Sequence, residues 1–69
     1  MDSLRLNYLM ECADLLTSYS ASMAEAAYQG NPERVRAYFD CARLVGRDIA
    51  KTLAEIEAAQ VTNDNRDAA

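Results

Sequence analysis

The sequence predicts an all-α protein, an antiparallel helical hairpin that dimerises into a four-helix bundle. Three observations carry this prediction. Two long segments repeat their apolar residues at intervals of three and four, as one face of a helix requires. The short segment between them ends one helix and begins another. The 69 residues include one Pro and two Gly, so little else interrupts either helix.

The first helix is expected over residues 3–29, with Asp2 or Ser3 as its cap. Its apolar residues form one stripe at helical spacing and a second flank beside it. The stripe comprises Leu6, Leu9, Ala13, Leu16, Ser20, Met23 and Ala27. The flank comprises Leu4, Tyr8, Leu15, Tyr19 and Ala26. Together they are wider than one neighbouring helix can cover.

The turn is expected at residues 30–31, between two long helices. Gly30 suits the left-handed position just past a helix end, where a Cβ is strained. Asn31 can cap the next helix, and Pro32 fits its first position, where the missing N–H costs nothing. A connection this short makes the two helices antiparallel neighbours.

The second helix is expected over residues 32–59, which completes a single helical domain of residues 1–59. Its apolar residues recur every seven positions in three columns. They are Val35, Ala42, Ile49 and Ile56; Tyr38, Val45, Thr52 and Ala59; and Phe39, Gly46 and Leu53. A sustained heptad favours near-parallel packing of the bundle type. Gly46 predicts a close approach of the first helix, and residues 60–69 read as a disordered tail.

The predicted core and dimer residues come from pairing positions across the hairpin, where numbers adding to about 61 face each other. They are Leu9, Leu16, Met23, Val35, Phe39, Ala42, Ile49, Leu53 and Ile56. In this register Leu9 meets Leu53 and Met23 meets Phe39. One seam cannot cover the remaining apolar flank, and a homodimer is the simplest way to bury it.

Catalysis is not expected. The chain has no His, so neither Cys12 nor Cys41 has an imidazole to activate it. The acidic residues are interpreted as solvated helix faces, and no spacing typical of a zinc or calcium site is present. We therefore predict a protein that is not an enzyme and has no catalytic residues, metal or cofactor.

Composition also bears on partners and location. The net charge of −4 argues against general nucleic-acid binding, which needs a basic surface. No apolar run approaches the ~20 residues of a membrane span, so no membrane association is expected. Cys12 and Cys41 lie ~12 Å apart along the predicted hairpin, too far for a disulfide. Free thiols suit a reducing compartment, and we expect a cytoplasmic protein.

Two surfaces are candidates for binding a partner. The hairpin end carries Tyr28, Gln29, Arg34 and Tyr38, and exposed Tyr beside Arg is typical of interaction hot spots. A binding surface at the hairpin end requires Tyr38 to be accessible, and we therefore expect Phe39 to enter the seam and Tyr38 to face outward. The alternative is a basic ridge, which comprises Arg36, Arg43, Arg47 and Lys51 on one face of the second helix.

Two resemblances accompany these features. Residues 27–42, with Gly30, Phe39 and Ala42, resemble the turn and second helix of a tetratricopeptide repeat, but no second repeat follows. The plan of a short helical hairpin is similar to that of plasmid-encoded Rop-type RNA-binding dimers. That second resemblance implies a dimeric bundle and RNA as a ligand, and it concerns architecture alone.

From these observations we expect a small acidic regulator that binds a protein and acts as a helical homodimer. An inhibitor, an anti-activator or an adaptor of the phage or plasmid type fits this description. Its partners are then a second copy of the chain and an unidentified protein. The alternative is an RNA- or DNA-binding helical bundle that uses the basic ridge.

Overall fold

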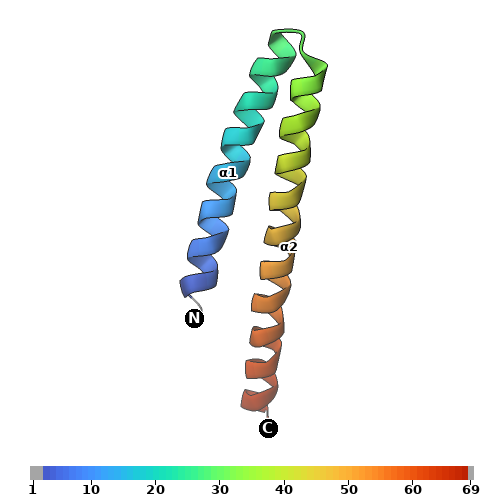
Figure 1. The fold of residues 1–69 in the computed structure, drawn as a ribbon. Coiled ribbons are helices and arrows are strands. Elements are labelled where there is room, and N and C mark those ends of the chain that lie inside the picture. Colours follow the sequence, from blue (N-terminus) through green and yellow to red (C-terminus); the bar gives the residue numbers. More distant parts are fainter. Residues whose placement is uncertain (1–2, 69) are drawn as a thin grey trace.

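The computed structural model consists of two helices that lie side by side and are joined by a tight turn (Figure 1). It describes residues 3–68, and their side chains as far as residue 60. Helix α1 comprises Ser3–Tyr28 and helix α2 comprises Pro32–Ala68. Residues 3–68 contain no strand. The predicted all-α hairpin is thus confirmed.

The helix ends differ from the predicted ones by one residue in α1 and by more in α2. Helix α1 ends at Tyr28 and not at residue 29. Helix α2 continues to Ala68, so residues 60–68, which we assigned to a disordered tail, belong to the helix. No Pro or Gly follows Gly46, and extending an existing helix fixes only one residue for each new hydrogen bond.

The turn provides hydrogen-bond partners for several of the free backbone groups at the ends of both helices. Gly30 has φ 71°, and its N–H bonds to the carbonyl of Ala27 at 3.0 Å. The N–H of Asn31 bonds to the carbonyl of Ala26 at 2.9 Å, which completes a Schellman motif. The Asn31 side chain accepts a bond from the N–H of Arg34 at 3.1 Å and so caps α2. Asn31 therefore ends one helix and begins the other.

We predict that Gly30→Ala lowers the free energy of unfolding by about 1 kcal/mol, because a Cβ is strained at positive φ. Space does not limit the change, since nothing lies within 4 Å of a Cβ built there. Thermal unfolding followed by circular dichroism should show a fall of ~4–8 °C. An unchanged melting temperature would mean that the turn tolerates another backbone conformation.

A single seam between the helices forms the core. Among residues 3–60, only Cys12, Ala26 and Thr52 are buried. The half-buried side chains around them include Leu9, Leu16, Tyr19, Met23, Val35, Tyr38, Ala42, Val45, Ile49 and Ile56. Seven of the nine predicted core residues thus lie in the seam, whereas Phe39 and Leu53 remain 44% and 42% exposed. The hairpin has no second layer that could cover them.

The seam is rotated by one residue from the one we predicted. Cys12 and Tyr19 occupy it in place of the exposed Ala13 and Ser20. In α2, Tyr38 and Thr52 take the places expected for Phe39 and Leu53, so the pairs Met23–Phe39 and Leu9–Leu53 do not form the seam. Adjacent residues on a helix point about 100° apart. The predicted seam column and the observed one next to it both repeat every seven residues, so the periodicity of the sequence alone does not show which of the two columns enters the seam.

Gly46 does not mark a close approach of α1. Nothing lies within 4 Å of a Cβ built on Gly46, so the predicted tight contact between the two helices at this position is wrong. The rotation of the seam is the reason, because Gly46 belongs to the same column as Phe39 and Leu53. A glycine in mid-helix thus has no steric purpose within the hairpin.

Candidate functional site

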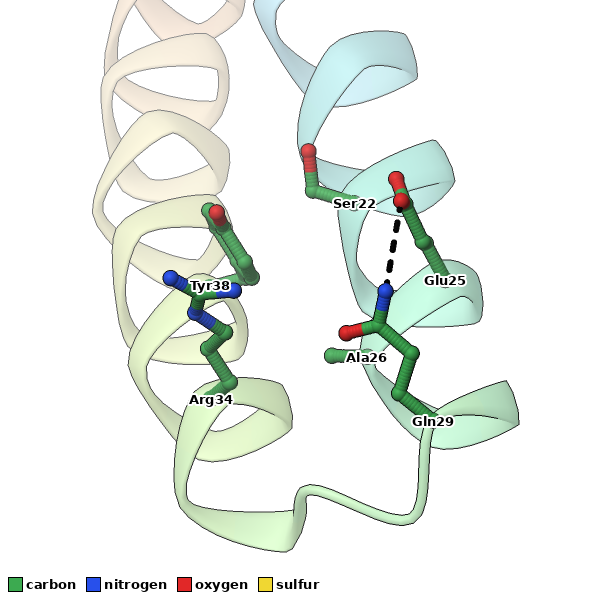
Figure 2. A pocket seen from close by; sticks show the side chains of 6 residues that line it. All are labelled: Ser22, Glu25, Ala26, Gln29, Arg34 and Tyr38. Carbon is green, nitrogen blue, oxygen red and sulfur yellow. Dashed lines mark hydrogen bonds between the residues drawn. The ribbon is translucent and has the colours of Figure 1, made fainter.

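An open depression lies at the turn end of the hairpin, between the two helices (Figure 2). Helix α1 contributes its last two turns and α2 its first two. The lining residues are Ser22, Glu25, Ala26, Gln29, Arg34 and Tyr38. The turn sets the register of the two helices, so residues whose numbers add to about 60 lie at the same height and face each other, as Arg5 and Glu55 do. This register brings the lining residues of the two helices together.

The depression presents both charges and several hydrogen-bonding groups. The Gln29 amide donates to the Glu25 carboxylate over 3.5 Å, a long contact one helical turn apart (Figure 2). Arg34 stands across from them on α2, with its backbone held by the Asn31 cap. A partner that enters this site therefore meets a guanidinium and a carboxylate on opposite walls.

Tyr38 belongs to both the seam and the lining of the depression. Its ring lies 6.5 Å from that of Tyr19, centroid to centroid, with the planes tilted by 40°. This separation is within the range of favourable aromatic pairs. The half-buried ring of Tyr38 thus belongs to the core, while the same residue lines the depression.

Of the four residues predicted for the hairpin end, the structure brings three together. Gln29, Arg34 and Tyr38 line the depression, whereas Tyr28 does not and is 94% exposed. Ser22 and Glu25 were missed by the sequence reasoning. The signal was present, because Ser22 and Glu25 precede Gln29 by seven and four residues and so share its helix face.

The predicted orientations of Tyr38 and Phe39 are reversed. Tyr38 is half-buried in the seam, while Phe39 is 44% exposed beside it. The guanidinium carbon of Arg36 lies 5.7 Å from the centre of the Phe39 ring, so a cation covers part of the exposed face. The tyrosine pair takes the place in the seam that we expected Phe39 to fill.

Polar contacts continue from the depression along the same face of the hairpin. Arg5 pairs with Glu55 at 3.1 Å, and the Tyr8 hydroxyl donates to the Asp48 carboxylate at 3.2 Å. The pKa of Tyr8 is raised to about 12. The largest cause is hydrogen bonding with the Cys12 thiol; hydrogen bonding with Asp48 and repulsion by the Asp48 charge add to it. We call this side of the hairpin the polar face.

The basic ridge runs along α2. Arg36, Arg43, Arg47 and Lys51 are all exposed, at spacings of seven and four. Arg36 pairs with Asp40 at 3.3 Å, so the first cation of the row is balanced by an acid of the same helix. The ridge is therefore a solvated row interrupted by a carboxylate, and it lies apart from the depression.

Among the residues that the structure describes, no group of three or more His, Cys, Asp or Glu side chains is placed to hold a metal ion. The thiols of Cys12 and Cys41 are free, the first buried and the second exposed. Neither α1 nor α2, within the described residues, has an apolar stretch long enough to cross a membrane.

Comparison of the chain with protein-family models, with curated proteins and with solved structures gives no match.

Proposed function

We propose that this chain is a small, acidic, non-enzymatic regulator that binds a protein partner through the turn-end depression and works as a homodimer. The observation that carries the proposal is the convergence of Gln29, Arg34 and Tyr38 in one depression. Gln29 directly follows α1, Arg34 and Tyr38 belong to α2, and their arrangement depends on the turn. An inhibitor, an anti-activator or an adaptor acts by such binding alone.

The chemistry of the depression favours a protein over a nucleic acid. Arg and Tyr are the side chains most often found at interaction hot spots. Glu25 lies in the same depression as Arg34, and its negative charge repels a phosphate. Peptide groups and mixed polar side chains can use the carboxylate, the amide and the guanidinium together. A polar segment of a protein is therefore the expected occupant.

The exposed area supports the homodimer. The chain exposes 5478 Å², whereas a compact protein of 7.6 kDa exposes about 4,300 Å². Its radius of gyration is 16.8 Å, against about 11 Å for a compact chain of this length. Part of the difference belongs to the end of α2, which extends past the start of α1 (Figure 1).

Binding of RNA or DNA through the basic ridge is the alternative. The ion pair of Arg36 with Asp40 and the net charge of −4 weigh against it. The two functions differ in the residues that they require. A nucleic-acid site needs Arg43 and Arg47 and weakens steeply with salt, whereas the depression needs Arg34.

The test begins with affinity capture from the native host and continues with a titration of the purified partner. We predict that Arg34→Ala weakens that complex at least fivefold, equivalent to about 1 kcal/mol, with unchanged circular dichroism. Glu33→Ala, an exposed neighbour outside the depression, is the control and should bind as the unaltered chain does.

Two results would contradict the proposal. Loss of binding in Arg43→Ala and Arg47→Ala, with Arg34→Ala unaffected and a steep salt dependence, would assign the function to the ridge. Sedimentation at micromolar concentration that reports a folded species of 7.6 kDa, and not of about twice that mass, would exclude the homodimer.

A further inference from the structure

The two charges of the turn-end depression do not neutralise each other. Arg34 and Glu25 stand on opposite walls, and the register of the hairpin places them at nearly the same height. They do not form an ion pair with each other, and no other side chain of the described residues forms one with either of them. The depression therefore presents one cation and one anion, each without an ion-pair partner in the hairpin.

Each charge is kept on its own wall by a local contact. The Glu25 carboxylate accepts a hydrogen bond of 3.5 Å from the amide of Gln29, four residues later (Figure 2). The backbone N–H of Arg34 donates to the Asn31 side chain, which fixes the first turn of α2. Within the described residues, the guanidinium of Arg34 has no hydrogen-bond acceptor. Its N–H donors are therefore available to a partner.

We propose that the depression binds a protein segment in which an acidic and a basic side chain lie close together, the acidic one at Arg34 and the basic one at Glu25. This inference rests on the proposed function and adds the chemistry of the partner. A guanidinium can donate two parallel hydrogen bonds to one carboxylate. An ammonium or a second guanidinium can donate to Glu25 on the other wall. A segment with both charges thus compensates both walls at once.

Partners that carry a single kind of charge fit the depression less well. A purely acidic segment is attracted by Arg34 and repelled by Glu25, and a purely basic segment meets the reverse. A phosphate, with up to two negative charges, is repelled by Glu25 more strongly than a carboxylate is. Complementary charges favour the correct partner, and like charges suppress wrong ones. The two walls together therefore select a segment with both charges.

Two hydroxyl groups complete the lining of the depression. Ser22 of α1 and Tyr38 of α2 both line it, and neither hydroxyl makes a hydrogen bond to another described residue. A hydroxyl group both donates and accepts hydrogen bonds. These two groups can therefore bind peptide groups of the segment beside its two charged side chains.

The chemistry is tested with three pentapeptides that are blocked at both ends and have glycine at the first, third and fifth positions. The two-charge peptide carries glutamate second and lysine fourth, because residues two apart in an extended chain lie on the same side. The acidic peptide has glutamine in place of the lysine, and the basic peptide has glutamine in place of the glutamate. Each is titrated into the ¹⁵N-labelled chain at low ionic strength, since salt screens exposed charges.

The two-charge peptide should bind about threefold more tightly than either of the other two, a modest factor because exposed ion pairs are weak. The side-chain NMR signals of Arg34 and Gln29 should shift together. Gln60, the other glutamine of the chain, is the internal control and should not shift. No binding of the two-charge peptide at millimolar concentration, or equal binding of the acidic peptide, would overturn the proposal. Inorganic phosphate that shifts Arg34 at a lower concentration would also overturn it.

Two neutral variants assign each peptide charge to a wall. In Glu25→Gln, the two-charge and acidic peptides should bind equally, because the lysine has lost its carboxylate. In Arg34→Gln, the two-charge and basic peptides should bind equally. Glu33→Gln removes a charge from an exposed neighbour outside the depression, and it should keep the threefold preference. A preference that survives in both Glu25→Gln and Arg34→Gln would place the peptide elsewhere and overturn the proposal.

The purified natural partner separates this inference from the proposed function. If Arg34→Ala weakens that complex and Glu25→Gln leaves it unchanged, the depression is the binding site but its occupant has no basic side chain at Glu25. That result overturns this inference and leaves the proposed function intact. If neither variant weakens the complex, both are overturned. Weakening by both variants, together with the preference for the two-charge peptide, is the expected result.

Discussion

Replacing Ile49 by Asp is expected to abolish the fold. Ile49 is half-buried in the one seam that joins α1 to α2. A carboxylate there has no cation opposite it, and burying an unpaired charge costs several kcal/mol. A domain of this size seldom has more than about 3–5 kcal/mol of stability to lose. Circular dichroism and urea unfolding should show a largely unfolded chain at 25 °C.

The control for this change is Leu44→Asp, which introduces the same charge in the same helix. Leu44 is 59% exposed and outside the seam, so its replacement should change the free energy of unfolding by less than about 0.5 kcal/mol. Equal losses in the two variants would mean that added negative charge, and not burial in the seam, destabilises this acidic protein.

Tyr38→Ala is expected to lower the free energy of unfolding by about 2 kcal/mol. Removing a fully buried aromatic side chain costs about 3–5 kcal/mol, and Tyr38 is only half-buried. The loss includes its contact with the Tyr19 ring, 6.5 Å away. Urea unfolding measures the effect. Tyr38→Ala is therefore unsuitable as a test of partner binding, because it disturbs the core as well as the depression.

Two other tyrosine variants make this prediction specific. Tyr28→Ala removes the same atoms from a residue that is 94% exposed, and it should leave the stability nearly unchanged. Tyr38→Phe keeps the ring against Tyr19 and removes only the hydroxyl in the depression. If Tyr28→Ala and Tyr38→Ala were equally destabilising, the tyrosine pair would not be part of the core.

The local structure follows from residues close together in the chain. The Gly30-Asn31-Pro32 segment contains each group that the turn requires, namely a left-handed position, a side-chain acceptor and a first helical residue without an N–H. These interactions span only a few residues, so they can be predicted without the rest of the fold. The antiparallel packing follows from the shortness of the connection.

The rotation of each helix about its own axis was decided by the tertiary structure alone. Two heptad columns lie side by side on each helix, and sequence periodicity places the apolar stripe only to within about one residue, or 100°. In the folded hairpin, the tilted rings of Tyr19 and Tyr38 pack together and Arg5 pairs with Glu55 across the seam, contacts between residues 19 and 50 positions apart. With these long-range contacts in place, Tyr38 lies inward and Phe39 and Leu53 remain outside.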